Sequence, residues 1–132
     1  MTYRYKIFED TKLVYVKADG TMRFQDLMEH IETLAKDPGY TSPMKKLLNY
    51  LELEKYEVTT RESEIFSKRK QELVNRFMNE KCAIVVPSDL IYGMARHHQA
   101  FVDPVRLETD IFRDINEAIR WLEIDPDQDF TL

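Results

Sequence analysis

The stretch Cys82-Ala-Ile-Val-Val-Pro87, followed by Ser88-Asp-Leu-Ile-Tyr-Gly-Met-Ala-Arg96-His97-His98, decides the fold. Its first part is a short apolar run rich in β-branched residues, and its second part opens with a capping serine. This order is typical of a buried parallel strand that leads directly into its crossover helix. We therefore expect a strand over Cys82–Val86 and a helix from Ser88 to about Phe101, and the pattern indicates the α/β class.

The N-terminal part of the chain predicts a hairpin followed by a helix. Residues 3–9 and 12–18 are two β runs joined by so short a link that they must pair antiparallel, and Asp19-Gly20 is expected to close the second strand. Apolar residues then recur at helical spacing over 24–36. The segment Asp37-Pro38-Gly39 cannot continue that helix.

The middle of the chain predicts a second strand–helix unit. Lys46–Leu51 is apolar apart from Asn49, and the acidic segment 52–58 after it is expected to be irregular. Thr59, Thr60 and Glu62 form a capping-box pattern, in which a threonine oxygen and a glutamate satisfy the first amide hydrogens of a helix. We expect that helix to cover residues 61–81, with a mixed-charge face towards solvent.

The C-terminal part predicts a last strand over Val105–Phe112 and a helix that ends near Leu122. Asp114-Ile-Asn-Glu117 is a second capping-box pattern. Residues 1–123 should form one domain, and the acidic tail 124–132 is expected to be frayed. The element order is β-β-α-β-α-β-α-β-α, which predicts a mixed, mostly parallel sheet of about five strands with about four helices.

The composition and net charge of the chain limit the classes of function that it can have. The 132-residue chain has a net charge of −5, with 24 acidic against 19 basic residues, which argues against nucleic-acid binding. Its single cysteine, Cys82, lies in an apolar strand and is expected to be a buried, inert thiol. No stretch is apolar enough for a membrane span or a signal peptide, so we expect a cytoplasmic protein.

Several of these features together resemble the SpoIIAA-like family, small bacterial domains related in fold to STAS domains and, more distantly, to CRAL-TRIO lipid-transfer domains. The resemblance covers about residues 3–123. The features are the hairpin with Gly20, Asp37-Pro-Gly-Tyr40, the strand with central Asn49, Ala83-Ile-Val-Val86, Tyr92-Gly-Met-Ala-Arg96, and Phe112 through Glu117-Ala118 to Trp121-Leu122. The resemblance implies a STAS-like fold and a non-catalytic regulatory or binding module.

The resemblance does not imply a phosphorylation site in this chain. STAS-type antagonists bind a partner kinase and are switched by phosphorylation of a serine or threonine in the loop after a central strand. In this chain the corresponding segment, Asn49–Glu54, contains no serine, threonine or glycine. The nearest hydroxyl groups, on Thr59 and Thr60, are already explained as helix caps.

Tyr92 and Arg96 are the first candidate contact residues. They are four residues apart on one helix, on a face expected to lie opposite an apolar stripe of Leu90, Ile91, Met94, Ala95 and His98. Tyrosine and arginine are favoured anchors in protein interfaces. The alternative is an exposed aromatic–cation pair of small stabilising value. Gly93 between them is expected to mark a close approach to another element.

Asn49 and Ser88 are further candidates, because ligands of open α/β sheets bind beyond the carboxyl ends of strands and anions bind at helix N-termini. The alternative is that both side chains satisfy local backbone groups. His97 is a candidate contact at the edge of the apolar stripe, but His97 and His98 are adjacent and cannot readily chelate one ion. We expect no catalytic set, no metal and no cofactor.

Two functions remain open. The first is a regulatory module that acts through a protein partner or by self-association as a homodimer. The alternative is a small-molecule or lipid carrier with an apolar pocket between helices and sheet, which six Met and seven Phe in one small core suggest. An enzyme is the least favoured reading.

Overall fold

A computed structural model describes residues 3–73, 80–99 and 107–132, with only the backbone described at 97–99 and 107. The elements follow the predicted order. They are β1 (Tyr3–Phe8), β2 (Leu13–Arg23), α1 (Phe24–Lys36), β3 (Lys45–Glu57), α2 (Thr60–Glu72), β4 (Glu80–Val85), α3 (Asp89–Gln99), β5 (Leu107–Phe112) and α4 (Ile115–Leu122).

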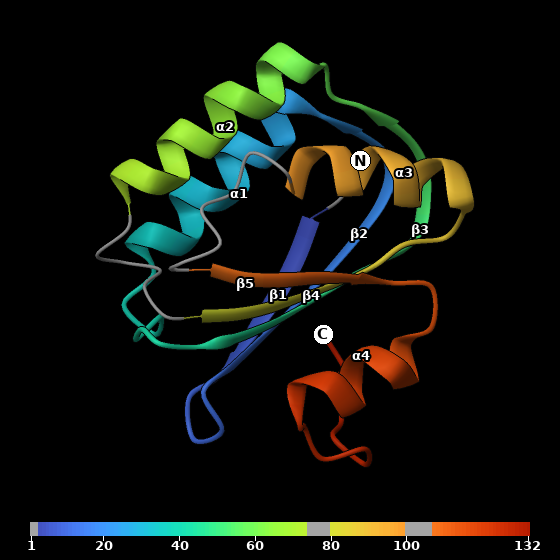
Figure 1. Ribbon diagram of the computed structural model, residues 1–132. Coiled ribbons are helices and arrows are strands. Elements are labelled where there is room, and N and C mark those ends of the chain that lie inside the picture. The colour runs from blue at the N-terminus through green and yellow to red at the C-terminus, as the bar shows by residue number, and fades with distance from the viewer. Residues whose placement is uncertain (1–2, 74–79, 100–106) are drawn as a thin grey trace.

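The sheet has five strands in the order β1-β2-β3-β4-β5. β1 is antiparallel to β2 and the remaining neighbours are parallel, which confirms the predicted mixed, mostly parallel sheet. Each parallel strand is added on the same side of the previous one, so crossovers of one hand place their helices on the same face. Figure 1 shows α1, α2 and α3 over one face and α4 on the other.

Each face of the sheet has its own apolar core, because alternate residues of a strand point to opposite faces. On β2, Val14, Val16 and Ala18 pack on the side of α1, α2 and α3. Leu13 and Tyr15 pack on the side of α4. A cavity lies on the α1–α3 side.

β2 and β3 extend beyond their predicted ends. Gly20 does not close β2, since its positive φ of 73° lets the strand pass through a register shift and continue to Arg23. The acidic segment expected to be irregular is the second half of β3, which pairs with this extension. Lys17–Glu52 and Arg23–Glu57 ion pairs, at 3.2 and 3.6 Å, hold acidic side chains of β3 against β2.

α2 begins as predicted but is shorter. Thr59 Oγ1 accepts a hydrogen bond from the Glu62 amide at 3.1 Å, and the Glu62 carboxylate accepts one from the Thr59 amide at 2.9 Å. The helix predicted over 61–81 ends at Glu72, and Glu80 and Lys81 already belong to β4. Residues 74–79, which the prediction places in this helix, lie outside the described residues.

The prediction of a frayed C-terminal tail is wrong. The Phe130 ring stacks on Tyr15 with centroids 4.6 Å apart and also meets Phe8 edge-on at 6.3 Å. α4 has only eight residues, and the returning tail adds a second cover to the same face of the sheet. Asp114 caps α4 through the Asn116 amide at 2.8 Å, instead of through the predicted pattern with Glu117.

Candidate functional site

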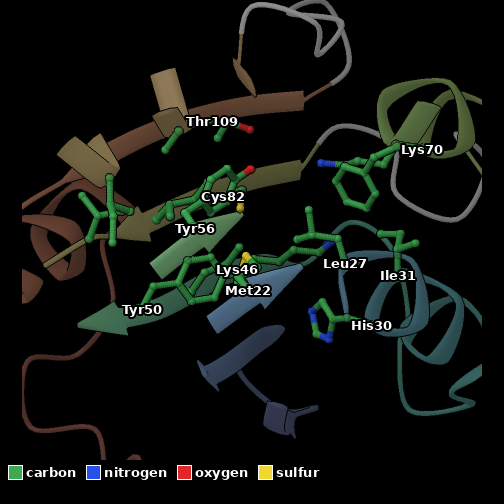
Figure 2. Close-up of a pocket in the computed structure, with 16 residues that line it drawn as sticks. Met22, Leu27, His30, Ile31, Lys46, Tyr50, Tyr56, Lys70, Cys82 and Thr109 are labelled. Carbon is green, nitrogen blue, oxygen red and sulfur yellow. The ribbon is translucent and has the colours of Figure 1, made fainter. Parts of the chain in front are cut away.

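A cavity of about 70 Å³ lies between the sheet and the helices α1, α2 and α3 (Figure 2). Its wall is mostly apolar and comes from all of these elements, with Leu27 from α1, Phe66 from α2 and Ile91 from α3. Met22 and Tyr56 lie on the extensions of β2 and β3, so the parts of the strands that the sequence did not predict form part of the wall.

Three nitrogen-bearing side chains interrupt this apolar wall. They are His30 from α1, Lys46 from β3 and Lys70 from α2. Figure 2 shows Lys70 extending from its helix towards the strand that carries Cys82, with Lys46 and His30 on the neighbouring wall. The two lysines differ in their surroundings, and that difference determines what the site can bind.

Lys46 is held by a carboxylate. Its Nζ lies 3.7 Å from Oε1 of Glu80, and both side chains are buried. Glu80 also accepts hydrogen bonds from the Tyr40 hydroxyl at 2.5 Å and from the Met44 amide at 3.0 Å. A buried ion pair is tolerated when further hydrogen bonds satisfy the carboxylate, as they do here.

Lys70 has no such partner in the part of the chain that the structure describes. No carboxylate there lies within ion-pair distance of its Nζ, which sits 5.4 Å from the centroid of the Phe66 ring. Burial, and then the nearby charge of Lys46, lower the pKa of Lys70 to about 8. The Lys70 ammonium therefore lacks a counter-charge on the wall of an apolar cavity.

His30 is neutral at physiological pH. Its ring stacks on Tyr3 with centroids 4.5 Å apart and meets Tyr5 edge-on at 6.2 Å. Burial, together with the charges of Lys46 and Lys70, lowers the pKa of His30 to about 3. The cavity therefore contains two lysines and an uncharged imidazole.

Cys82 also lies on the cavity wall. Its side chain is buried as predicted, and burial raises the pKa of the thiol despite the two neighbouring lysines. The thiol, and not the more nucleophilic thiolate, is the form present at neutral pH.

Asn49 and Ser88 form hydrogen bonds within the fold and do not line the cavity. Asn49 Nδ2 donates to the Tyr15 hydroxyl at 2.9 Å, and its Oδ1 accepts from the Leu51 amide at 3.1 Å. Ser88 Oγ accepts from the Ile91 amide at 3.2 Å, so it caps α3. Tyr15 belongs to the core under α4, which places the Asn49 contact on the opposite face of the sheet from the cavity.

Tyr92 and Arg96 adjoin each other on α3, as predicted. The Arg96 guanidinium lies 5.9 Å from the Tyr92 ring centroid, and its Nη1 lies 3.8 Å from Asp110 Oδ1. Arg96 is exposed, whereas Tyr92 is half-buried against the core under the helices, so the two do not share a fully outward face. The side chains of His97 and His98 lie outside the described residues.

The predicted apolar stripe on α3 is partly wrong. Ile91 and Ala95 are buried, but Leu90 is 70% exposed and Met94 is 37% exposed. The expected close approach at Gly93 is also wrong for the part of the chain that the structure describes, where a Cβ built on Gly93 would meet nothing within 4 Å. Ile91 and Ala95 are the α3 residues in the buried cluster, and Tyr92, which was expected on the opposite face, packs against that cluster.

The three residues that distinguish the cavity, His30, Lys46 and Lys70, were not among the predicted site residues. Each of the three residues has a spacing in the sequence that places it on the same face of its helix or strand as apolar residues, or beside one. Lys46 alternates with Leu48 and Tyr50 on one strand face, His30 precedes Ile31 in an apolar stripe, and Lys70 is four residues from Phe66. None of these signals shows that the three side chains meet.

No protein-family model matches the sequence, and no curated protein does. A solved structure that is similar is an uncharacterised protein of the DUF3478 family from Shewanella loihica PV-4, with a SpoIIAA-like fold. It is 20% identical, the match covers 92% of each chain, and the TM-score is 0.58. In the described residues, no helix is both long and apolar enough to cross a bilayer. This chain has a SpoIIAA-like fold, as its sequence features predicted.

Proposed function

We propose that the protein binds a small amphipathic anion, a short apolar chain ending in a carboxylate, in the cavity under α1, α2 and α3. The observation that carries the proposal is Lys70, whose ammonium lines an apolar cavity with no carboxylate within ion-pair distance among the described residues. This is a narrower form of the carrier alternative that the sequence left open.

The energetics favour such a ligand. An ammonium without a counter-charge in an apolar site is unfavourable, and a bound carboxylate would supply both the charge and the hydrogen-bond acceptor. The apolar wall would add about 25 cal/mol for each Å² of ligand surface removed from water. The volume of about 70 Å³ limits the size of the ligand. Cavities of about 150 Å³ hold benzene, which has as many heavy atoms as butanoate, so this smaller volume admits the carboxylate end of a short chain but not a whole phospholipid.

The test is calorimetric titration with butanoate at pH 7, with butanol as the uncharged ligand of the same chain length. We expect saturable binding of butanoate and at least tenfold weaker binding of butanol. Lys70→Met should lower the affinity for butanoate by at least tenfold. The matched control is Lys68→Met, on the exposed face of the same helix, which should leave affinity unchanged. Equal affinity of wild type and Lys70→Met would refute the proposal.

A second candidate function is the protein-interaction module that the family resemblance implies. The observation that favours it is the pair Leu90 and Met94, which are one helical turn apart on α3 and both exposed. Arg96 is already engaged with Asp110, so the apolar pair is the better anchor for self-association. Sedimentation equilibrium tests this reading. A dimer that Leu90→Glu dissociates would support it, and a monomer at all concentrations would exclude self-association.

A further inference from the structure

We propose that Lys70 is a nucleophilic amine that condenses reversibly with a small apolar aldehyde in the cavity. This inference rests on the proposed function in one respect only, namely that the cavity admits small ligands. It adds a covalent reaction and a second ligand class, a carbonyl compound, to the same site.

The geometry supplies what an amine nucleophile needs. Lys70 lines a cavity whose wall is mostly apolar, and the second lysine on that wall, Lys46, disfavours another charge beside it. In the described residues the one carboxylate of the cluster, Glu80, is occupied by Lys46, Tyr40 and the Met44 amide, so it does not stabilise the charged form of Lys70 through an ion pair. Lys70 is consequently the amine that loses its proton most easily here.

The acid–base state agrees with this geometry. The pKa of Lys70 is lowered to about 8, so about a tenth of the side chain is the free amine at pH 7. An ordinary exposed lysine, with a pKa near 10.4, is about two-hundredfold less populated as the free amine at the same pH. The difference makes Lys70 the preferred site of attack on a carbonyl that enters the cavity.

The reaction needs no oxidant, reductant or metal. The Nζ lone pair attacks the carbonyl carbon, the C=O π electrons move to oxygen, and a proton passes from nitrogen to oxygen to give a carbinolamine. The carbinolamine oxygen then takes a proton from solvent and leaves as water as the C–O bond breaks. The nitrogen lone pair forms the C=N bond, and the nitrogen returns its remaining proton to solvent to leave the imine. The aldehyde and the lysine thus give an imine and one water, and hydrolysis reverses every step.

Cys82 is the competing nucleophile on the same wall. A thiol adds to an aldehyde to give a hemithioacetal, and borohydride reagents do not trap that adduct as a stable product. An imine is instead reduced to a secondary amine, which survives digestion and peptide mapping. Reductive trapping therefore distinguishes Lys70 from Cys82.

The experiment incubates the folded protein with butanal and cyanoborohydride at pH 7 and follows each lysine by peptide mass spectrometry. We expect Lys70 to be alkylated at least tenfold faster than Lys68, which is exposed on the same helix. The Lys70 rate should rise with pH and level off above about 8, in line with its lowered pKa. Alkylation of Lys70 no faster than Lys68 would overturn the proposal.

Butanoate separates the failure of this inference from that of the proposed function. If butanoate binds and Lys70 is no faster than Lys68, the anion site stands and the nucleophile is refuted. If Lys70 is faster and butanoate neither binds nor protects it, the nucleophile stands and the anion site is refuted. Lys70→Arg keeps the charge and removes the nucleophile, so it should retain butanoate binding and lose the fast-reacting site.

Discussion

The Tyr40 hydroxyl donates a hydrogen bond to Oε1 of Glu80 at 2.5 Å, and both side chains are buried. This contact joins the loop after α1 to the first residue of β4. The same carboxylate balances Lys46, so it holds one lysine of the cavity in place while leaving Lys70 without an ion pair among the described residues. Stability and the proposed ligand site thus depend on one shared carboxylate.

We expect Glu80→Gln to destabilise the protein by about 3 to 5 kcal/mol, because it leaves the buried Lys46 ammonium uncompensated. Tyr40→Phe removes one hydrogen bond from the same carboxylate and should cost about 1 to 3 kcal/mol. Urea unfolding at pH 7 measures both. The double variant Glu80→Gln/Lys46→Met removes the orphaned charge and should recover part of the loss. A Glu80→Gln variant as stable as wild type would contradict this account.

His30 makes stability depend on pH below neutrality. Its pKa is about 3 in the folded protein against 6.5 for the free side chain. Between these values the unfolded chain binds a proton that the folded protein does not, so stability falls as pH decreases from 6.5 towards 3. We expect the free energy of unfolding of His30→Phe, which keeps an aromatic ring against Tyr3, to lose this part of the pH dependence. The check is urea unfolding of both proteins at intervals from pH 4 to 7. Parallel curves for the two proteins would exclude His30 as the cause.

Lys70 makes the free energy of unfolding depend on pH above neutrality as well. Its pKa of about 8 lies below the ordinary value of 10.5, so the unfolded chain binds the extra proton between these values and stability through Lys70 rises with pH there. We expect Lys70→Met to be about 1 kcal/mol more stable than wild type at pH 7. Its advantage should shrink as pH rises from 8 to 10.5. Chemical unfolding at pH 7, 9 and 10 tests this. An advantage that stays constant over this range would show that the gain comes from packing instead of charge.

The fold could be predicted from the sequence because its signals are local. The apolar run 82–86 followed by Ser88, the hairpin at the N-terminus and the Thr59 cap each reveal an element without knowledge of its neighbours. The extensions of β2 and β3 could not be predicted in this way, since Gly20 and the acidic residues after Leu51 have low intrinsic propensity for β-strands. Pairing of the two strands across a register shift, with cross-strand ion pairs, overrides that local preference.

The candidate site could not be predicted for a related reason. His30, Lys46 and Lys70 come from three elements that are far apart in the chain and meet only once α1 and α2 cover the sheet. Lys70 in particular lies in a helix of mixed charge, where a solvated lysine is the ordinary expectation. The sequence could suggest an apolar pocket from its methionines and phenylalanines, but not which charged groups would face it.

Gly93 and Gly20 provide the last prediction, because the two glycines have opposite backbone requirements. Gly93 lies inside α3, and no described residue lies within 4 Å of its Cβ position, so Gly93→Ala should stabilise the protein by up to about 1 kcal/mol through helix propensity. Gly20 has a φ of 73°, where an L side chain is strained, so Gly20→Ala should destabilise it by about 1 kcal/mol or more. Thermal unfolding of both variants under the same conditions measures these two changes in stability. A loss of stability in Gly93→Ala would mean that this face of α3 is covered in solution. Leu90 and Met94 would then be expected to contact a partner or a second copy.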